Sequence, residues 1–381
     1  MTPLPAPVPA RRRRAPHTLS RQLLAALLLA SSVATASGAE QVDRAPFRVG
    51  ALEAAAGTRA SALLPIPATG SDAGTSIPVT IVHGARPGPR LALIAGIHGY
   101  EYPGIMALQR LRATLDPAQL AGTVIMVHIA NLPSFLGRTV YTNPVDGENL
   151  NRMFPGDPDG TLSERIAHLI TLEVIEQADY LIDLHAGDGN EALRPYIYMP
   201  RTGDPAIDGP SRGLAEAFLL DTIVIDHVEI AARDATGFTD MTAWSRGVPA
   251  ITTETGQLGS NDEHYVDMAS AGLWNVLRHL AMVPGAVVPN DGIVWLEDYE
   301  VIPSPASGVF RAAVKDGWSV AEGGRLGVLT DFFGDEIAVI RAPFAGVVNY
   351  VIGTPPISEG EPVAMVSRVA DAPPAVGPSS P

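Results

Sequence analysis

The stretch Leu91-Ala92-Leu93-Ile94-Ala95-Gly96-Ile97-His98-Gly99-Tyr100-Glu101 joins a continuous apolar run to a short polar motif. Continuous apolar runs, rather than alternating ones, are typical of strands that are covered on both faces. His98 and Glu101 are three residues apart, so a helical turn after the strand would point both side chains in one direction. The stretch therefore predicts a buried strand that leads directly into a candidate metal-binding pair.

Similar apolar runs recur along the chain between about residues 88 and 283, and helix-like segments separate them. The further strands are expected at 124–129, 180–184, 222–225 and 249–253, and the helices at 103–114, 163–177 and 262–282. Strands that alternate with helices predict an α/β domain whose mostly parallel or mixed sheet is flanked by helices.

From about residue 288 the helical periodicity stops, and glycine and proline punctuate short strands, as in a small all-β module. This region contains an internal repeat, because 304–309 matches 342–347 and 320–323 matches 357–360. The repeated pattern resembles half of a biotinyl/lipoyl-type barrel-sandwich domain. Those carriers bear a lysine between the two halves, but 330–335 contains none, so we expect a structural or lid role.

The first 39 residues have the features of an export signal. Several arginines precede a short apolar segment, 23–30, and small residues follow with possible cleavage after Ala36 or Ala39. The alternative is an uncleaved anchor, although a spanning helix needs roughly 20 apolar residues. We therefore expect a periplasmic or secreted protein without stable membrane association after cleavage.

Charge and cysteine content exclude several kinds of function. The formal net charge is −15, and the arginines of the leader make the remainder more negative still, which argues against nucleic acid as a partner. The chain has no cysteine, so disulfides, thiolate metal ligands and a cysteine nucleophile are impossible. A small-molecule partner remains, and the oligomeric state is left open.

A third metal ligand is expected at His185, where the apolar run 180–182 meets a loop at the edge of the sheet. His98, Glu101 and His185 together offer the nitrogen and oxygen ligands that Zn²⁺ accepts, and three protein ligands leave a position open for water. Asp183 lies on the same strand face and could orient His185. The alternative for His185 is an ordinary histidine beneath a loop.

Glu254 ends another apolar run, and a carboxylate there can take a proton from the zinc-bound water and pass it to the leaving amine. The alternative is a surface glutamate at a strand end. Asn151 and Arg152 lie in a turn-rich loop and can clamp a substrate carboxylate. Arg138 is expected to polarise the scissile carbonyl, and a plain salt bridge is its alternative.

These segments, in this order, resemble the succinylglutamate desuccinylase/aspartoacylase family, whose members are relatives of the zinc carboxypeptidases. The motifs G-x-H-G-x-E at 96–101, D-G-x-N-L-N-R-x-F-P-G at 146–156, D-L-H at 183–185 and E-T-G at 254–256 carry the resemblance, which covers roughly 75–370. It implies a zinc-carboxypeptidase-like fold with a C-terminal barrel-sandwich-like module. It also implies the ligand and catalytic roles given above.

The family resemblance implies a zinc-dependent amidohydrolase that cleaves the amide of an N-acyl amino acid or a related small amide, with one Zn²⁺ per chain. An exported carboxypeptidase-like peptidase acting on peptides or cell-wall fragments is the alternative. A non-catalytic binding protein is disfavoured because Glu254 and the ligand set are all present. The expected domains are a signal peptide at 1–39, a zinc hydrolase domain at 40–287, a β module at 288–370 and a flexible tail at 371–381.

Overall fold

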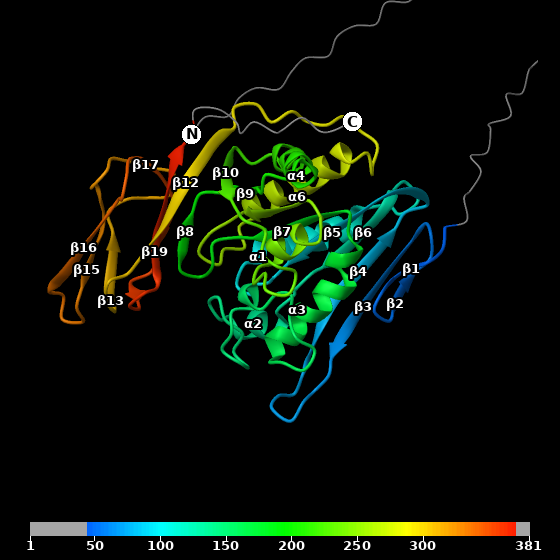
Figure 1. Cartoon of the computed structure of the whole chain (residues 1–381), viewed down its shortest axis with the longest axis horizontal. Helices are drawn as coiled ribbons and strands as arrows, with labels where there is room; N and C mark the ends of the chain where they lie inside the picture. Colours follow the sequence, from blue (N-terminus) through cyan, green and yellow to red (C-terminus); the bar gives the residue numbers. More distant parts are fainter. Residues whose placement is uncertain (1–43, 371–381) are drawn as a thin grey trace, which may run out of the picture. The chain divides into compact units, whose positions relative to one another are not determined.

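This computed structural model describes residues 44–370. The main element of the fold is a mixed sheet of 13 strands (Figure 1). The strand order is β14 (Ser319–Val320), β17 (Gly346–Ile352), β19 (Pro362–Val369), β12 (Val294–Pro303), β10 (Thr222–His227), β9 (Tyr196–Arg201), β11 (Ala250–Glu254), β7 (Tyr180–His185), β5 (Arg86–Ala95), β6 (Ala121–Val127), β4 (Thr75–His83) and β3 (Thr58–Ile66), with β8 (Glu191–Leu193) paired to β17. The predicted export signal and C-terminal tail lie outside the described residues.

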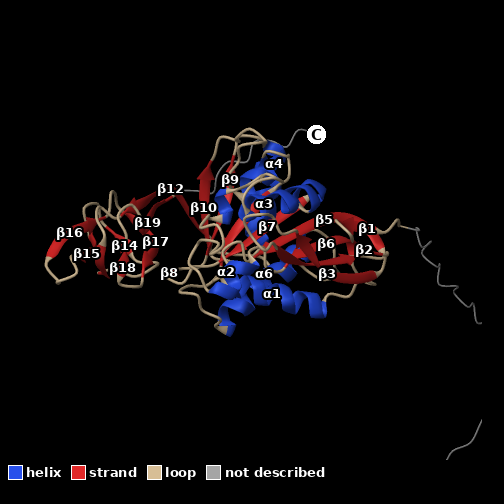
Figure 2. Cartoon of the chain, turned by 90° about the horizontal axis from the view of Figure 1, so that it is seen from below, coloured by secondary structure: helices blue, strands red, loops and turns tan. Residues whose placement is uncertain are grey.

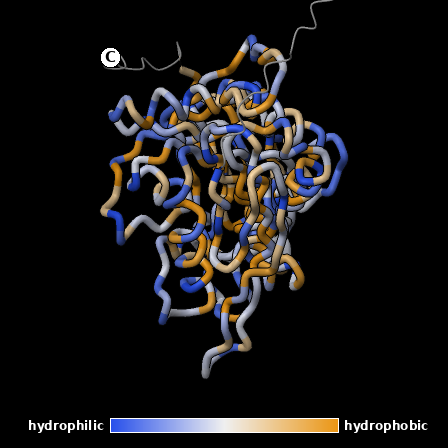
Figure 3. The backbone as a smooth tube through the Cα atoms, turned by 90° about the vertical axis from the view of Figure 1, so that its right-hand side faces the viewer, coloured by the Kyte–Doolittle hydropathy of each residue, from blue (hydrophilic) through white to orange (hydrophobic). Residues whose placement is uncertain are grey.

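Helices cover both faces of this sheet. They are α1 (Tyr102–Thr114), α2 (Leu132–Gly137), α3 (Leu162–Glu173), α4 (Pro205–Ala217), α5 (Thr239–Trp244) and α6 (Glu263–His279), with short 3-10 turns η1 (Leu150–Arg152) and η2 (Ile175–Gln177). Figure 2 shows α1 and α6 on one side of the sheet and α3 on the other, and two separate apolar clusters fill these two interfaces. Hydrophobic residues accordingly gather along the central strands (Figure 3). The expected α/β architecture with a mixed sheet is confirmed.

The helix after the first quoted strand forms for local reasons. Pro103 lies in the first turn of α1, where its missing N–H costs nothing, and Ile105, Leu108 and Leu111 form a buried stripe at helical spacing. Gly104 lets the helix approach β7, because a Cβ there would lie 2.9 Å from the Cβ of Leu184. This close packing fixes the start of α1 beside the end of β7.

The central strands bring polar residues to one edge of the sheet. β5 pairs in parallel with both β6 and β7, and β7 pairs in parallel with β11. In the last of these pairings Glu254 is in register with His185. Parallel neighbours end at the same edge, so the motifs that follow β5, β7 and β11 meet there.

The C-terminal region consists of strands only, as expected. A second sheet has the order β16 (Glu336–Arg341), β15 (Arg325–Thr330), β13 (Gly308–Ala312) and β18 (Pro356–Ile357). The internal repeat is visible in the pairing, because β13 of the first copy pairs with β18 of the second, while β17 of the second copy pairs with β14 of the first. The strands of each copy of the repeat therefore pair with strands of the other copy.

The main sheet continues without a break from the hydrolase region into the β module. β12 follows the predicted boundary near residue 288; it pairs in parallel with β10 on one side and antiparallel with β19 on the other. β8, which comes from the hydrolase region, pairs with β17 of the module. Two further short strands, β1 (Phe47–Val49) and β2 (Leu52–Ala54), form a separate ribbon. Within residues 44–370, none of the helices combines the length and apolar character needed to cross a bilayer.

Candidate metal and hydrolase site

The three predicted metal ligands come from two neighbouring strand ends. After β5 the chain turns at Gly96, whose φ of +69° is unfavourable for other residues, and a Cβ there would lie 3.0 Å from the Cα of Ile129. This turn places His98 in the loop and Glu101 at the N-cap position of α1. His185 is the last residue of β7, the adjacent parallel strand.

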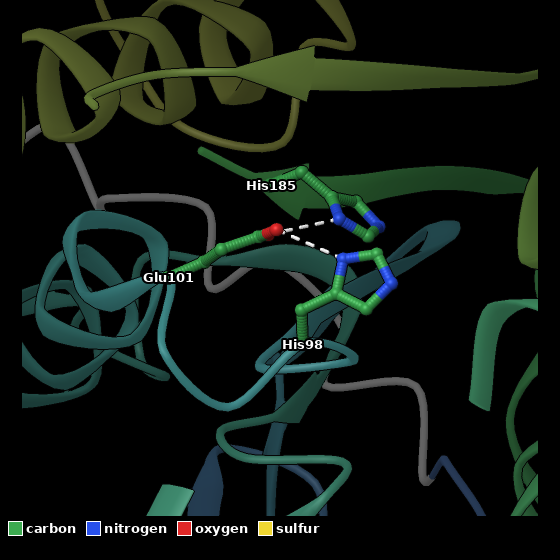
Figure 4. Close-up of side chains that lie close together, drawn as sticks. All are labelled: His98, Glu101 and His185. Atoms are coloured by element: carbon green, nitrogen blue, oxygen red, sulfur yellow. Dashed lines mark hydrogen bonds and ion pairs between the residues drawn. The ribbon is translucent and has the colours of Figure 1, made fainter. Parts of the chain in front are cut away.

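The carboxylate of Glu101 points toward both imidazole rings (Figure 4). Its Oε1 is 2.8 Å from Nδ1 of His98, and its Oε2 is 2.9 Å from Nδ1 of His185. One donor atom from each of the three residues falls within 4.8 Å of the others, a spacing that one cation could bridge. The structure therefore brings together the residues that the sequence predicts as ligands.

The outer nitrogens of both histidines are held by oxygen atoms. Nε2 of His185 donates to Oδ2 of Asp183 at 3.0 Å, and Nε2 of His98 donates to Oδ1 of Asn149 at 3.1 Å. With the protons on Nε2, each Nδ1 could bind a metal ion in place of its contact with the Glu101 carboxylate. Two imidazole nitrogens and a carboxylate in this arrangement fit Zn²⁺, so the site is a candidate zinc centre.

The electrostatics of the cluster favour a cation. Burial opposes the charged form of Glu101, but the imidazoles of His98 and His185 outweigh it and lower the pKa of this carboxyl to about 2. Glu101 is therefore an anion, which is the form that binds metals. Ala186 also donates its backbone N–H to Oε2 at 3.1 Å, which fixes the orientation of the carboxylate.

A cavity of about 460 Å³ opens beside the cluster. It is lined by His98, Glu101, Tyr141, Thr142, Asn149, Arg152, Glu191, Leu193, Tyr196, Tyr198, Glu254, Val301, Tyr350 and Pro362. Glu254 lies at the end of β11 and thus faces the same space as the ligands. Burial and the nearby Glu101 carboxylate raise its pKa well above the usual value.

This geometry agrees with the relatives of the chain. Residues 87–280 match the succinylglutamate desuccinylase/aspartoacylase catalytic domain. The chain belongs to this family. It is 30% identical over 302 residues to the N-alpha-acetyl-L-2,4-diaminobutyric acid deacetylase of Halomonas elongata, a match that covers 77% of this chain and 86% of the relative.

Solved structures of relatives have the same fold. The product-bound ectoine utilization protein EutE (DoeB) from Ruegeria pomeroyi superposes with a TM-score of 0.74 at 29% identity, over 81% of this chain and 95% of that one. A succinylglutamate desuccinylase from Silicibacter sp. TM1040 gives a TM-score of 0.74 at 26% identity, over 86% and 98%. Both matches extend well beyond the catalytic domain, so the relatives share most of the chain's architecture.

Of the two residues predicted to bind the substrate carboxylate, Arg152 lines the cavity and Asn151 does not. The guanidinium of Arg152 stacks on the ring of Phe238, 4.4 Å from the centroid. The Oδ1 of Asn151 accepts hydrogen bonds from the backbone N–H and hydroxyl of Thr239 at 3.0 and 3.1 Å. Asn149 faces the cavity instead. Direct substrate contact by Asn151 stays a prediction.

Arg138 lies outside the group of residues that line the cavity. It is exposed and ends α2 in the left-handed region, with a φ of +53°. This backbone conformation is unusual for a residue with a side chain. The carbonyl-polarising role of Arg138 therefore stays a prediction.

Sequence reasoning missed Asn149 and the aromatic wall of the cavity. Tyr196 and Tyr198 lie on β9, which follows a turn-rich segment, and Tyr350 lies on β17 of the β module. Only the folded sheet brings these three residues to the cavity beside the metal cluster. Asn149 was visible in the N-L-N-R motif, but its contact with His98 depends on the turn that η1 makes. The β module thus contributes to the wall of the cavity, and its structural or lid role stays a prediction.

Asp183→Asn should weaken metal binding by about 10–100-fold, because the carboxylate that holds Nε2 of His185 is replaced by an amide of similar shape. Asp183 is 1% exposed, so solvent cannot replace the lost interaction. Competition for zinc with a chelator of known affinity measures the change. The exposed Asp234→Asn serves as a control. Unchanged affinity in Asp183→Asn would contradict the orienting role.

Proposed function

We propose that this protein is a zinc-dependent deacylase that hydrolyses the amide bond of an N-acyl amino acid. The proposal depends mainly on one observation: the cluster of His98, Glu101 and His185 shares a cavity with the carboxyl group of Glu254. Membership of the family and the relationship to an N-acetyl amino acid deacetylase support the same reaction class.

His98, Glu101 and His185 would hold the zinc ion through two imidazole nitrogens and a carboxylate. Zinc, when bound there, lowers the pKa of a water molecule and polarises the amide carbonyl. Glu254 then takes the proton from the attacking water and delivers it to the nitrogen of the leaving amine. Its raised pKa suits this exchange, because the group must accept and release a proton in one turnover.

Arg152 is the proposed binding group for the carboxylate of the substrate. Among residues 44–370 no carboxylate forms an ion pair with it, although its Nη1 donates to the backbone oxygen of Asn151 at 2.7 Å. Stacking on Phe238 holds the planar guanidinium in place without occupying its other donors. A free planar fork is suited to bidentate binding of a carboxylate.

The test is a parallel screen of the purified protein with N-acetyl amino acids and with short unmodified peptides. We expect release of acetate and a free amino acid from the first group, with kcat/KM far above that for the second. Preference for peptides with a free C-terminal carboxylate would contradict the deacylase and favour the exported peptidase. We also propose that the protein acts in the periplasm or outside the cell, which sequencing the N-terminus of the mature protein tests.

A further inference from the structure

Glu191 is a carboxylate in the cavity wall that the proposed zinc chemistry does not use. Its Oε1 accepts a hydrogen bond from the hydroxyl of Tyr141 at 3.0 Å, and its Oε2 accepts one from the backbone N–H of Asp188 at 3.1 Å. No basic side chain within residues 44–370 forms an ion pair with it. Glu191 is partly exposed and lines the cavity, and burial raises the pKa of its carboxyl to about 7, so a cationic ligand beside it would stabilise its charged form.

Aromatic side chains surround the same part of the cavity. Leu193 lies on the same face of β8 as Glu191, and directly opposite Leu193 on β17 is Tyr350. Tyr198 also lines this wall. Burial, together with the neighbouring Glu191 and Glu254 carboxylates, raises the pKa of Tyr350, so its phenol stays neutral. Neutral aromatic rings beside a carboxylate form a favourable environment for an ammonium group.

Outside the metal cluster and Glu254, the cavity wall has one basic and one acidic side chain. They are the guanidinium of Arg152 and the carboxylate of Glu191. A substrate with an α-carboxylate for Arg152 and a second, charged amine for Glu191 would satisfy both groups. An N-acyl amino acid with a neutral or acidic side chain would leave Glu191 unpaired.

We infer that Glu191 binds a cationic amine on the side chain of the substrate, so that the substrate class is the N-acyl diamino acids. This inference rests on the proposed deacylase function and deepens it. Glu191 acts as a specificity residue: it binds the part of the substrate that does not react. The acylated nitrogen is neutral and is left for the zinc site and Glu254.

The first arm of the test compares three substrates with the zinc-loaded wild-type protein. They are Nα-acetyl-2,4-diaminobutyrate, its neutral isostere Nα-acetylnorvaline, and the anionic Nα-acetylaspartate. We expect kcat/KM for the cationic substrate to exceed that for the neutral one by about 10–100-fold, the range for a hydrogen bond to a charged group. The anionic substrate should be the poorest, because its side chain would face Glu191.

The second arm uses Glu191→Gln, which keeps the shape of the side chain and removes its charge. The ratio of kcat/KM for the cationic substrate to kcat/KM for the norvaline derivative should fall toward one, and an unchanged melting temperature and zinc content report intact folding. Glu361→Gln is the matched control, because Glu361 accepts from Nδ2 of Asn190 at 3.2 Å and does not line the cavity. This control should retain the full preference.

Equal kcat/KM for the three substrates, or an undiminished preference in Glu191→Gln, would overturn the inference while leaving the deacylase function intact. A preference for an amine on the acyl group, tested with glycylnorvaline, would also overturn it. If no N-acyl amino acid is hydrolysed, the proposed function itself fails. Calorimetric binding of free 2,4-diaminobutyrate and norvaline to the wild type needs no variant, and equal affinities would count against Glu191.

Discussion

Replacing Glu254 with glutamine should leave zinc binding intact and lower kcat by about 10²–10⁴-fold, the usual effect of removing a general acid-base. The amide has nearly the same shape as the carboxyl group but cannot accept the proton of the attacking water. Glu254 is not one of the three cluster residues, so the metal content should not change. Metal analysis and initial rates with an N-acetyl amino acid measure the two quantities separately.

The matched control for this variant is Glu300→Gln, which changes an exposed glutamate on β12. It should have wild-type rates and wild-type zinc content. Near-normal turnover in Glu254→Gln would refute the assigned role and point to another proton carrier in the cavity. Loss of zinc from Glu254→Gln would instead place this residue among the ligands.

The second large effect is expected for His98→Ala, which removes one of the two imidazole ligands. The remaining pair, Glu101 and His185, offers too few protein ligands for a stable zinc site, so bound zinc and hydrolysis should both be lost. Zinc should also stop raising the melting temperature, because a ligand stabilises a protein only through the site that it occupies. Metal analysis and thermal unfolding with and without zinc check these effects.

His264→Ala is the corresponding control, because His264 is an exposed residue near the start of α6 and does not line the cavity. It should keep both zinc and activity. Full zinc occupancy in His98→Ala would show that the ligand assignment is wrong, whatever the effect on the rate.

The clustering of the three candidate ligands could be predicted from the sequence, because each of them lies next to a buried strand. The apolar runs before His98 and His185 predict two strands, and parallel pairing of β5 with β7 then brings both strand ends to one edge. Glu101 follows from its spacing to His98, since the start of α1 turns the two side chains together. Local patterns sufficed here because short segments determine both the strands and the turn.

The remainder of the site depends on contacts that no local pattern records. Asn149 lines the cavity where Asn151 was predicted to, because η1 turns the chain and Asn151 binds Thr239 of a helix distant in sequence. Tyr350 reaches the cavity because β17 of the β module pairs with β8. The short strand β8 itself, which carries Glu191, has too few residues for a recognisable period.

The most direct test of the central claim is a zinc titration of metal-depleted protein. Chelation should abolish hydrolysis of an N-acetyl amino acid. Added zinc should restore the rate linearly up to about one equivalent per chain, as a single site with three protein ligands requires. Full activity in protein shown by metal analysis to contain no zinc would contradict the account.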